Sequence, residues 1–148
     1  MNPIALLIAI VIGALLPLQA LVNARLGQLT FGPLFAALAS FAVGTLALLA
    51  VWLVAARPDG AAWQMPPWWA WTGGLVGAAF VFAATLLVPR LGAAALICLV
   101  VGGQLAGSLL LDHFGVLQAR QPVDAMRLLG MLLVAAGMLL VVRPWQQG

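Results

Sequence analysis

The sequence predicts an all-α integral membrane protein with five transmembrane helices. Hydrophobic residues make up 66% of the 148 residues and charged residues only 6%, whereas a soluble domain carries roughly 25% charged residues. The mean hydropathy is +1.19. Apolar runs long enough to cross the hydrocarbon core, which takes about 20 residues, recur five times. The connections between these runs are too short to hold an extramembrane catalytic domain.

Turn signals set the ends of the expected helices. The first run has no basic region before it and no cleavage site, so we interpret it as a retained span and not as a signal peptide. A Phe-Gly-Pro turn at 31–33 precedes the second run, and Arg-Pro-Asp-Gly at 57–60 ends it. Pro89 and Arg90 end the third, and the fourth ends at Asp112. We expect a single transmembrane domain over residues 1–148, with helices at approximately 3–23, 33–56, 68–89, 91–112 and 126–143.

Two amide side chains share one face of the first expected helix. Gln19 and Asn23 are one helical turn apart, and Pro17 frees the carbonyl group of Gly13 from its usual hydrogen bond. Because unsatisfied polar groups are costly in lipid, these amides should face protein or a water-filled cavity. We therefore predict that Gln19 and Asn23 bind a substrate. The alternative is that they cross-link helices, each contributing on the order of 1 kcal/mol.

Three more side chains are candidates for the same cavity: Ser40 in the second run, Trp71 in the third and Gln104 in the fourth. Ser108 and Asp112 follow Gln104 at four-residue steps and extend a polar stripe to the membrane surface. For Gln104 the alternative is again a link between helices. For Trp71 the alternative is a place in the aromatic belt at the membrane interface.

The six arginines are balanced across the expected membrane. One side holds Arg57, Arg120 and Arg127, and the other holds Arg25, Arg90 and Arg143. Orientation normally follows an excess of Lys and Arg on the cytoplasmic side, so equal numbers predict that the chain inserts both ways. Two oppositely oriented copies would form an antiparallel homodimer with 5+5 inverted symmetry. The alternative is that a weak bias or a partner protein fixes one orientation.

Small residues at helical spacing predict close packing of the helices. Gly130 and Gly137 lie seven residues apart in the fifth run, which carries no polar side chain between them, and we predict that they pack at a dimer interface. Three other ridges of this kind are Ala36–Ser40–Gly44, Gly73–Gly77 and Gly103–Gly107.

Asp112 and His113 are the candidates for a coupling or gating role, because histidine changes charge near neutral pH. The alternative is a helix cap or an interfacial salt bridge. With one cysteine, Cys98, and one histidine, we expect no metal site and no cofactor. The sequence contains no nucleophile–base pair, so we do not expect an enzyme, and six arginines are too sparse for a nucleic-acid partner.

Four stretches of the sequence carry a family resemblance: GALLPLQALVNARLGQLTFGPLFAALASFAVG, FVFAATLLVPRLGAA, VVGGQLAGSLLLDHFG and RLLGMLLVAAGMLLV. Together they resemble the YdcZ-like family of five-span bacterial inner-membrane proteins in the drug/metabolite transporter superfamily. The resemblance implies an exporter of an unassigned small molecule, working in the lipid bilayer as an antiparallel homodimer or with a paralogue. The small multidrug exporters of that superfamily use a membrane-embedded glutamate, and this chain has no glutamate, so proton antiport of that type is not expected.

Two other classes of function stay open at this point. A dual-topology dimer with a neutral polar cavity is also compatible with a passive ion channel. A third class is an assembly subunit whose polar residues only pack. A transporter saturates at modest rates, a channel dissipates a gradient at high turnover, and an assembly subunit does neither.

Overall fold

A computed structural model describes residues 3–55, 65–117 and 119–143, and this part of the chain is helical without any strand. Five of its helices are long and apolar enough to cross a membrane, which confirms the predicted all-α class and the number of spans. The turn predicted at 57–60, with Arg57, lies outside the described residues. The elements are α1 (Pro3–Leu29), α2 (Pro33–Val54), the 3-10 helix η1 (Trp68–Thr72), α3 (Gly73–Leu91), α4 (Ala93–Phe114) and α5 (Ala125–Val142).

The observed bounds differ most from the expected ones at the end of the first helix. α1 continues through Pro17 and reaches Leu29, where we expected an end near residue 23. Arg25 is therefore a helical residue and not part of a connection. The turn to α2 follows at once and uses Gly32, whose φ of 102° favours glycine. In this longer helix Gln19 and Asn23 lie ten and six residues before the last residue, Leu29, and not at the helix end.

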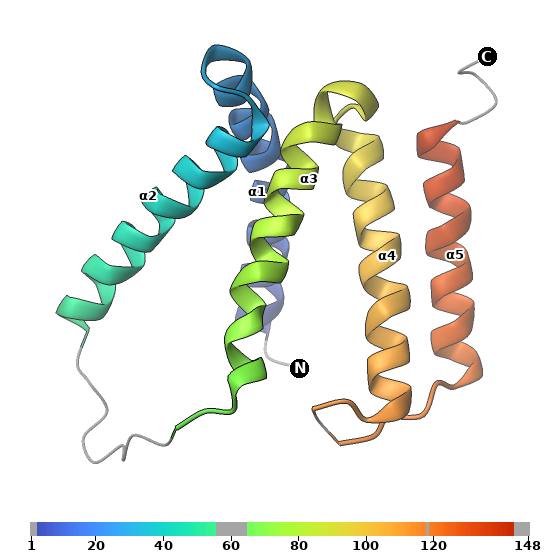
Figure 1. Ribbon diagram of the computed structural model, residues 1–148. Coiled ribbons are helices and arrows are strands. Elements are labelled where there is room, and N and C mark those ends of the chain that lie inside the picture. The colour runs from blue at the N-terminus through green and yellow to red at the C-terminus, as the bar shows by residue number, and fades with distance from the viewer. Residues whose placement is uncertain (1–2, 56–64, 118, 144–148) are drawn as a thin grey trace. The chain divides into compact units, whose positions relative to one another are not determined.

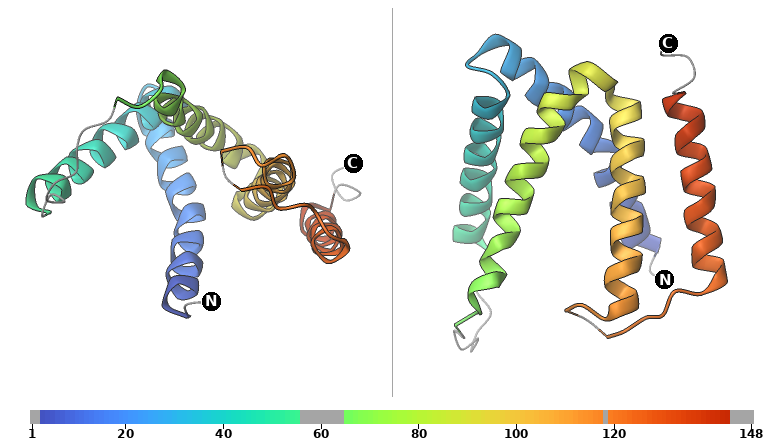
Figure 2. Two further views of the ribbon diagram at one scale, coloured as in Figure 1. Left: turned by 90° about the horizontal axis from the view of Figure 1, so that it is seen from below. Right: turned by 45° about the vertical axis from the view of Figure 1, so that its right-hand side comes forward.

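The chain divides into two compact units, residues 1–90 and 91–148, which we describe separately. In the first unit, α1 and α2 pack against each other next to the turn that joins them. The two helices then diverge toward the start of α1 and the end of α2, as the two viewing directions show (Figures 1 and 2). The buried residues of these two helices are Ala20, Asn23, Ala24 and Gly27 of α1 and Ala36 and Ala37 of α2.

Small side chains explain why α1 and α2 can approach so closely. Ala36 is completely buried, and Gly27 faces the turn with no room for a side chain. A Cβ atom on Gly27 would lie 3.2 Å from the carbonyl carbon of Gly32 and 3.3 Å from the Cα of Pro33. In lipid, such contacts between backbones are a main source of helix association.

In the second unit, α4 and α5 pack against each other and are joined by the connection at residues 115–124. Gly102 of α4 lies opposite the thioether of Met138, and a Cβ atom on Gly102 would be 3.2 Å from its Sδ. α4 ends in a Schellman motif: Gly115 has φ 67°, and the N–H of Val116 donates to the carbonyl of Leu111. At the start of α5, the Asp124 carboxylate accepts from the backbone N–H of Arg127 at 2.8 Å.

Candidate functional site

Asn23 and Ser40 link α1 to α2 inside the span. Asn23 is only 5% exposed, and its Nδ2 donates to the Oγ of Ser40 at 3.3 Å. The alanines around this pair bring the two backbones close enough for such short side chains to meet. The arrangement matches the cross-linking alternative for Asn23. Because the Ser40 hydroxyl accepts this bond, its own proton stays available to a further acceptor.

Gln19 has the opposite surroundings, although it lies only one turn from Asn23. Its side chain is exposed, and no residue in 3–55, 65–117 or 119–143 forms a hydrogen bond with its amide. It lines a pocket together with residues of α2. A primary amide can donate two hydrogen bonds and accept two, so Gln19 offers unused capacity inside an apolar span.

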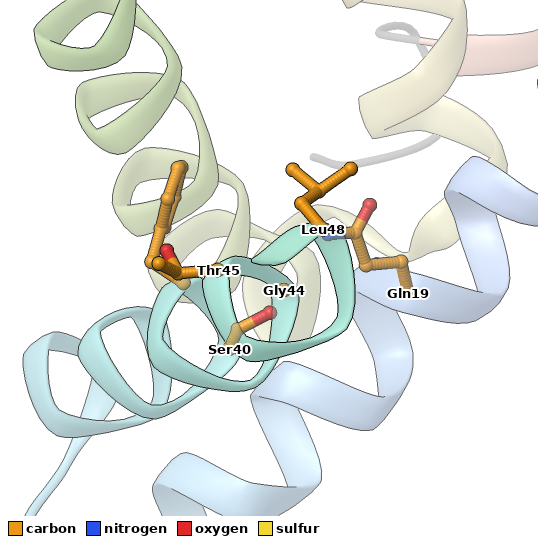
Figure 3. A pocket seen from close by; sticks show the side chains of 6 residues that line it. Gln19, Ser40, Gly44, Thr45 and Leu48 are labelled. Carbon is orange, nitrogen blue, oxygen red and sulfur yellow. The ribbon is translucent and has the colours of Figure 1, made fainter. Parts of the chain in front are cut away.

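An open pocket of about 200 Å³ lies where α1 and α2 separate. Figure 3 shows Ser40, Gly44 and Leu48 along α2, with the Gln19 side chain reaching from α1 toward Leu48. The space beside Gly44 is open, because a Cβ atom there would have nothing within 4 Å. The complete lining is Gln19, Ser40, Phe41, Gly44, Thr45 and Leu48.

The chemistry of this pocket is neutral. It combines one amide and two hydroxyl groups with an aromatic ring and an aliphatic wall, and no charged side chain takes part. Such a site can orient a ligand by hydrogen bonds while its apolar part lies against Phe41 and Leu48. Thr45 was missed by the sequence reasoning. Phe41 and Leu48 were also not among the predicted site residues. Thr45 follows Phe41 by four residues, which puts both side chains on the same face of α2.

Trp71 and Gln104 do not belong to the lining of this pocket. Trp71 lies in η1, before α3 begins, and is 65% exposed. That place at a helix start is typical of an interfacial tryptophan. Gln104 is an exposed residue of α4 in the second unit. The substrate contacts predicted for both residues stay predictions.

Asp112 and His113 hold the connection between α4 and α5. Oδ2 of Asp112 lies 3.6 Å from Nη1 of Arg127, and Nδ1 of His113 accepts from the N–H of Val123 at 3.3 Å. The carbonyl of His113 also accepts from Nε of Arg120 at 2.9 Å. These contacts suit the cap and salt-bridge alternative, and the coupling role stays a prediction.

Gly130 and Gly137 lie on an open face of α5. A Cβ atom on either glycine would meet nothing within 4 Å, whereas Met138, on the adjacent face, contacts α4 at Gly102. Among the described residues, no group of three metal-ligating side chains occurs, and Cys98 is partly buried. The predicted packing role of the two glycines needs a second chain and stays a prediction.

Comparisons with known proteins agree with the resemblance given above. The family model described as "Putative inner membrane exporter, YdcZ" matches residues 4–140. Comparison with curated proteins gives no match, and comparison with solved structures gives none either. The match covers all five spans, so the family description applies to the membrane domain as a whole.

Proposed function

Because the chain belongs to the YdcZ family of multi-pass inner-membrane exporters, we propose that it exports a small molecule by alternating access in an antiparallel homodimer. In this proposal each copy contributes the pocket of Gln19, Ser40 and Thr45 to a shared cavity. Gln19 and Ser40 position the substrate through hydrogen bonds, and Phe41 and Leu48 contact its apolar part. Asn23 holds α1 against α2 and fixes the direction of the Ser40 hydroxyl.

One observation carries this proposal: the Gln19 amide is exposed inside an apolar span and opens into a pocket without a hydrogen-bond partner among the described residues. Facing lipid, that amide would lose hydrogen bonds that water supplies in the unfolded chain. A substrate, water in a cavity or the second copy removes this cost. Each of the three is a component of a central transport cavity.

The transport part of the proposal is tested by substitutions that change the pocket and not the helix contact. We expect cells that overproduce the protein to enrich at least one metabolite in the medium, detected by untargeted mass spectrometry. Gln19→Leu removes the amide, and Gly44→Leu fills the pocket, so both should abolish this enrichment at equal protein level. Gly13→Leu is the matched control, because Gly13 also has open space around it but does not line the pocket.

Two outcomes would contradict transport through this pocket. Enrichment that survives both pocket variants would place the substrate elsewhere. A gradient that collapses at high turnover in proteoliposomes, without saturation, would indicate a channel.

The antiparallel arrangement is tested separately by the location of the C-terminal end. Cys98 is replaced by alanine, a cysteine is added after Gly148, and intact cells are labelled with a membrane-impermeant thiol reagent before and after permeabilisation. Dual topology predicts that about half of the copies are labelled from outside. Labelling from one side only would rule out pairing between opposite copies of this chain and would direct the search to a paralogue.

A further inference from the structure

The arginines of this chain are divided equally between the two sides of the membrane, whereas the aspartates all lie on one side. Its three acidic residues are Asp59, in the α2–α3 connection by sequence, Asp112, in the last turn of α4, and Asp124, at the start of α5. In a five-span topology all three lie on one side of the membrane. That side also holds three of the six arginines, so its side-chain charges cancel. The formal net charge of +3 therefore lies on the other side, with Arg25, Arg90 and Arg143.

The arginines of the two sides also differ in their contacts. Arg127 pairs with Asp112 at 3.6 Å and also donates to Gln121 at 2.8 Å. On the other side, Arg25 forms no salt bridge among the described residues, and its Nη1 donates to Oε1 of Gln28 at 3.3 Å. The guanidinium of Arg25 is exposed and keeps most of its donors for another acceptor.

Arg25 and Gln28 form the rim of a pocket of about 220 Å³ between α1 and α3, both within the first unit. Leu21 and Ala24 lie on α1 toward the middle of the span, and Val88 and Pro89 provide the wall from α3. Arg90 follows Pro89 directly and lies in the last turn of α3. The pocket is thus polar at the helix ends and apolar below them.

We propose that this pocket binds one anionic phospholipid, with the phosphate group on Arg25 and Gln28 and an acyl chain against Leu21, Ala24 and Val88. A guanidinium presents paired N–H donors that match phosphate oxygens, and the Gln28 amide can add a donor beside them. Lipid is favoured over a soluble phosphate because the rim lies at the ends of two spans, at the depth of the headgroups, and the apolar wall continues below it. The excess positive charge on this side favours an anionic headgroup.

This proposal needs only that the chain spans a membrane, and it does not depend on what the protein exports. In an antiparallel dimer the two copies would hold one such lipid in each leaflet. If the chain had one orientation, all of these lipids would lie in one leaflet.

The test uses the purified full-length protein in nanodiscs of phosphatidylcholine mixed with phosphatidylglycerol, followed by native mass spectrometry of the lipid that stays bound after release. We expect retained phosphatidylglycerol on the wild-type chain and about tenfold less retention for Arg25→Gln, which removes a charge-assisted hydrogen bond. Arg25→Lys should keep part of the retention. Arg143→Gln is the matched control, because it removes one charge from the same side but does not line the pocket.

A second variant tests whether lower lipid retention could result from misfolding instead of from loss of the binding site. Leu21→Trp fills the apolar part of the pocket without a change in charge, and it should also lower retention while helix content by circular dichroism stays unchanged. Three results would overturn the proposal: equal loss in Arg143→Gln, equal retention of phosphatidylcholine and phosphatidylglycerol, or displacement of the lipid by inorganic phosphate, which would indicate a site for a soluble phosphate.

Discussion

The two helix pairs of this protein place their polar contacts at different depths. In α1–α2 the contact lies inside the span, where the buried Asn23 donates to Ser40 among alanines. In α4–α5 the middle of the contact is apolar, with Gly102 opposite Met138. The polar contacts of this second pair lie at the connection, where Asp112 meets Arg127.

This difference separates two uses of polar residues in a membrane protein. At the end of a span, water competes for every hydrogen bond and ion pair, so Asp112 and Arg127 can organise a connection at little cost in folding free energy. Inside the span no water competes, and each polar atom needs a partner from protein, ligand or a cavity. In the first pair Asn23 has a hydrogen-bond partner, whereas the Gln19 amide has none among the described residues, which is why we place the transport site there.

The largest effect should come from closing the space at the α1–α2 turn. Gly27→Leu puts a side chain where even a Cβ atom would lie 3.2 Å from backbone of Gly32, and backbone cannot move aside as a flexible side chain can. We expect a loss of about 1–3 kcal/mol in the free energy of unfolding. The measurement is unfolding of the purified protein by increasing denaturing detergent, with Gly13→Leu as control.

Similar stability of Gly27→Leu and Gly13→Leu would contradict this prediction. It would mean that α1 and α2 are not held as closely as described, and that the Asn23–Ser40 contact does not depend on small residues. The α1–α2 pair would then not differ from the α4–α5 pair by a close contact inside the helices.

The sequence was sufficient for the class and the number of helices, because apolar runs bounded by turns identify spans without any tertiary information. It was not sufficient for the end of α1. Arg25 and Gln28 look like connection residues, but helical backbone satisfies its own hydrogen bonds in water as well as in lipid, so the helix continues to Leu29.

The site was only partly predictable, for a geometric reason. Four-residue spacing puts Gln19 and Asn23 on one face of α1, and it cannot tell which of them meets α2 and which lies where the helices have diverged. The glycines of α4 show the same limit. Gly103 and Gly107 have the spacing of a packing ridge, but Gly102 makes the contact with Met138, because the rotation of a helix about its axis is set by its neighbour.

An intermediate effect should separate the two amides of α1. Asn23→Leu loses the hydrogen bond to Ser40, and polar contacts inside membrane proteins contribute about 0.6 kcal/mol on average and up to about 1.7 kcal/mol. Gln19→Leu should leave the unfolding free energy unchanged or raise it, because its amide has no protein partner to lose among the described residues. The same detergent titration measures both variants.

A double-mutant cycle shows whether the effect of Asn23 passes through Ser40. Ser40→Ala alone should cost about as much as Asn23→Leu, and the double variant should cost little more than either one, because the two residues share one bond. Full additivity would mean that the 3.3 Å contact does not contribute to stability. A large loss for Gln19→Leu would assign the cross-linking role to both amides.

The smallest effect should come from the ion pair of the second helix pair. The side chains of Asp112 and Arg127 are 25% and 38% exposed, so solvent and salt screen their attraction. Asp112→Asn should lower the unfolding free energy by no more than about 1 kcal/mol, and the loss should shrink as salt is raised. The matched measurement is Asn23→Leu, whose loss should not depend on salt, because a neutral hydrogen bond inside the span has no net charge to screen. A salt-independent loss for Asp112→Asn would mean that its carboxylate acts through hydrogen bonds shielded from water. The polar contacts of the two helix pairs would then differ in their position along the helices but not in the type of interaction.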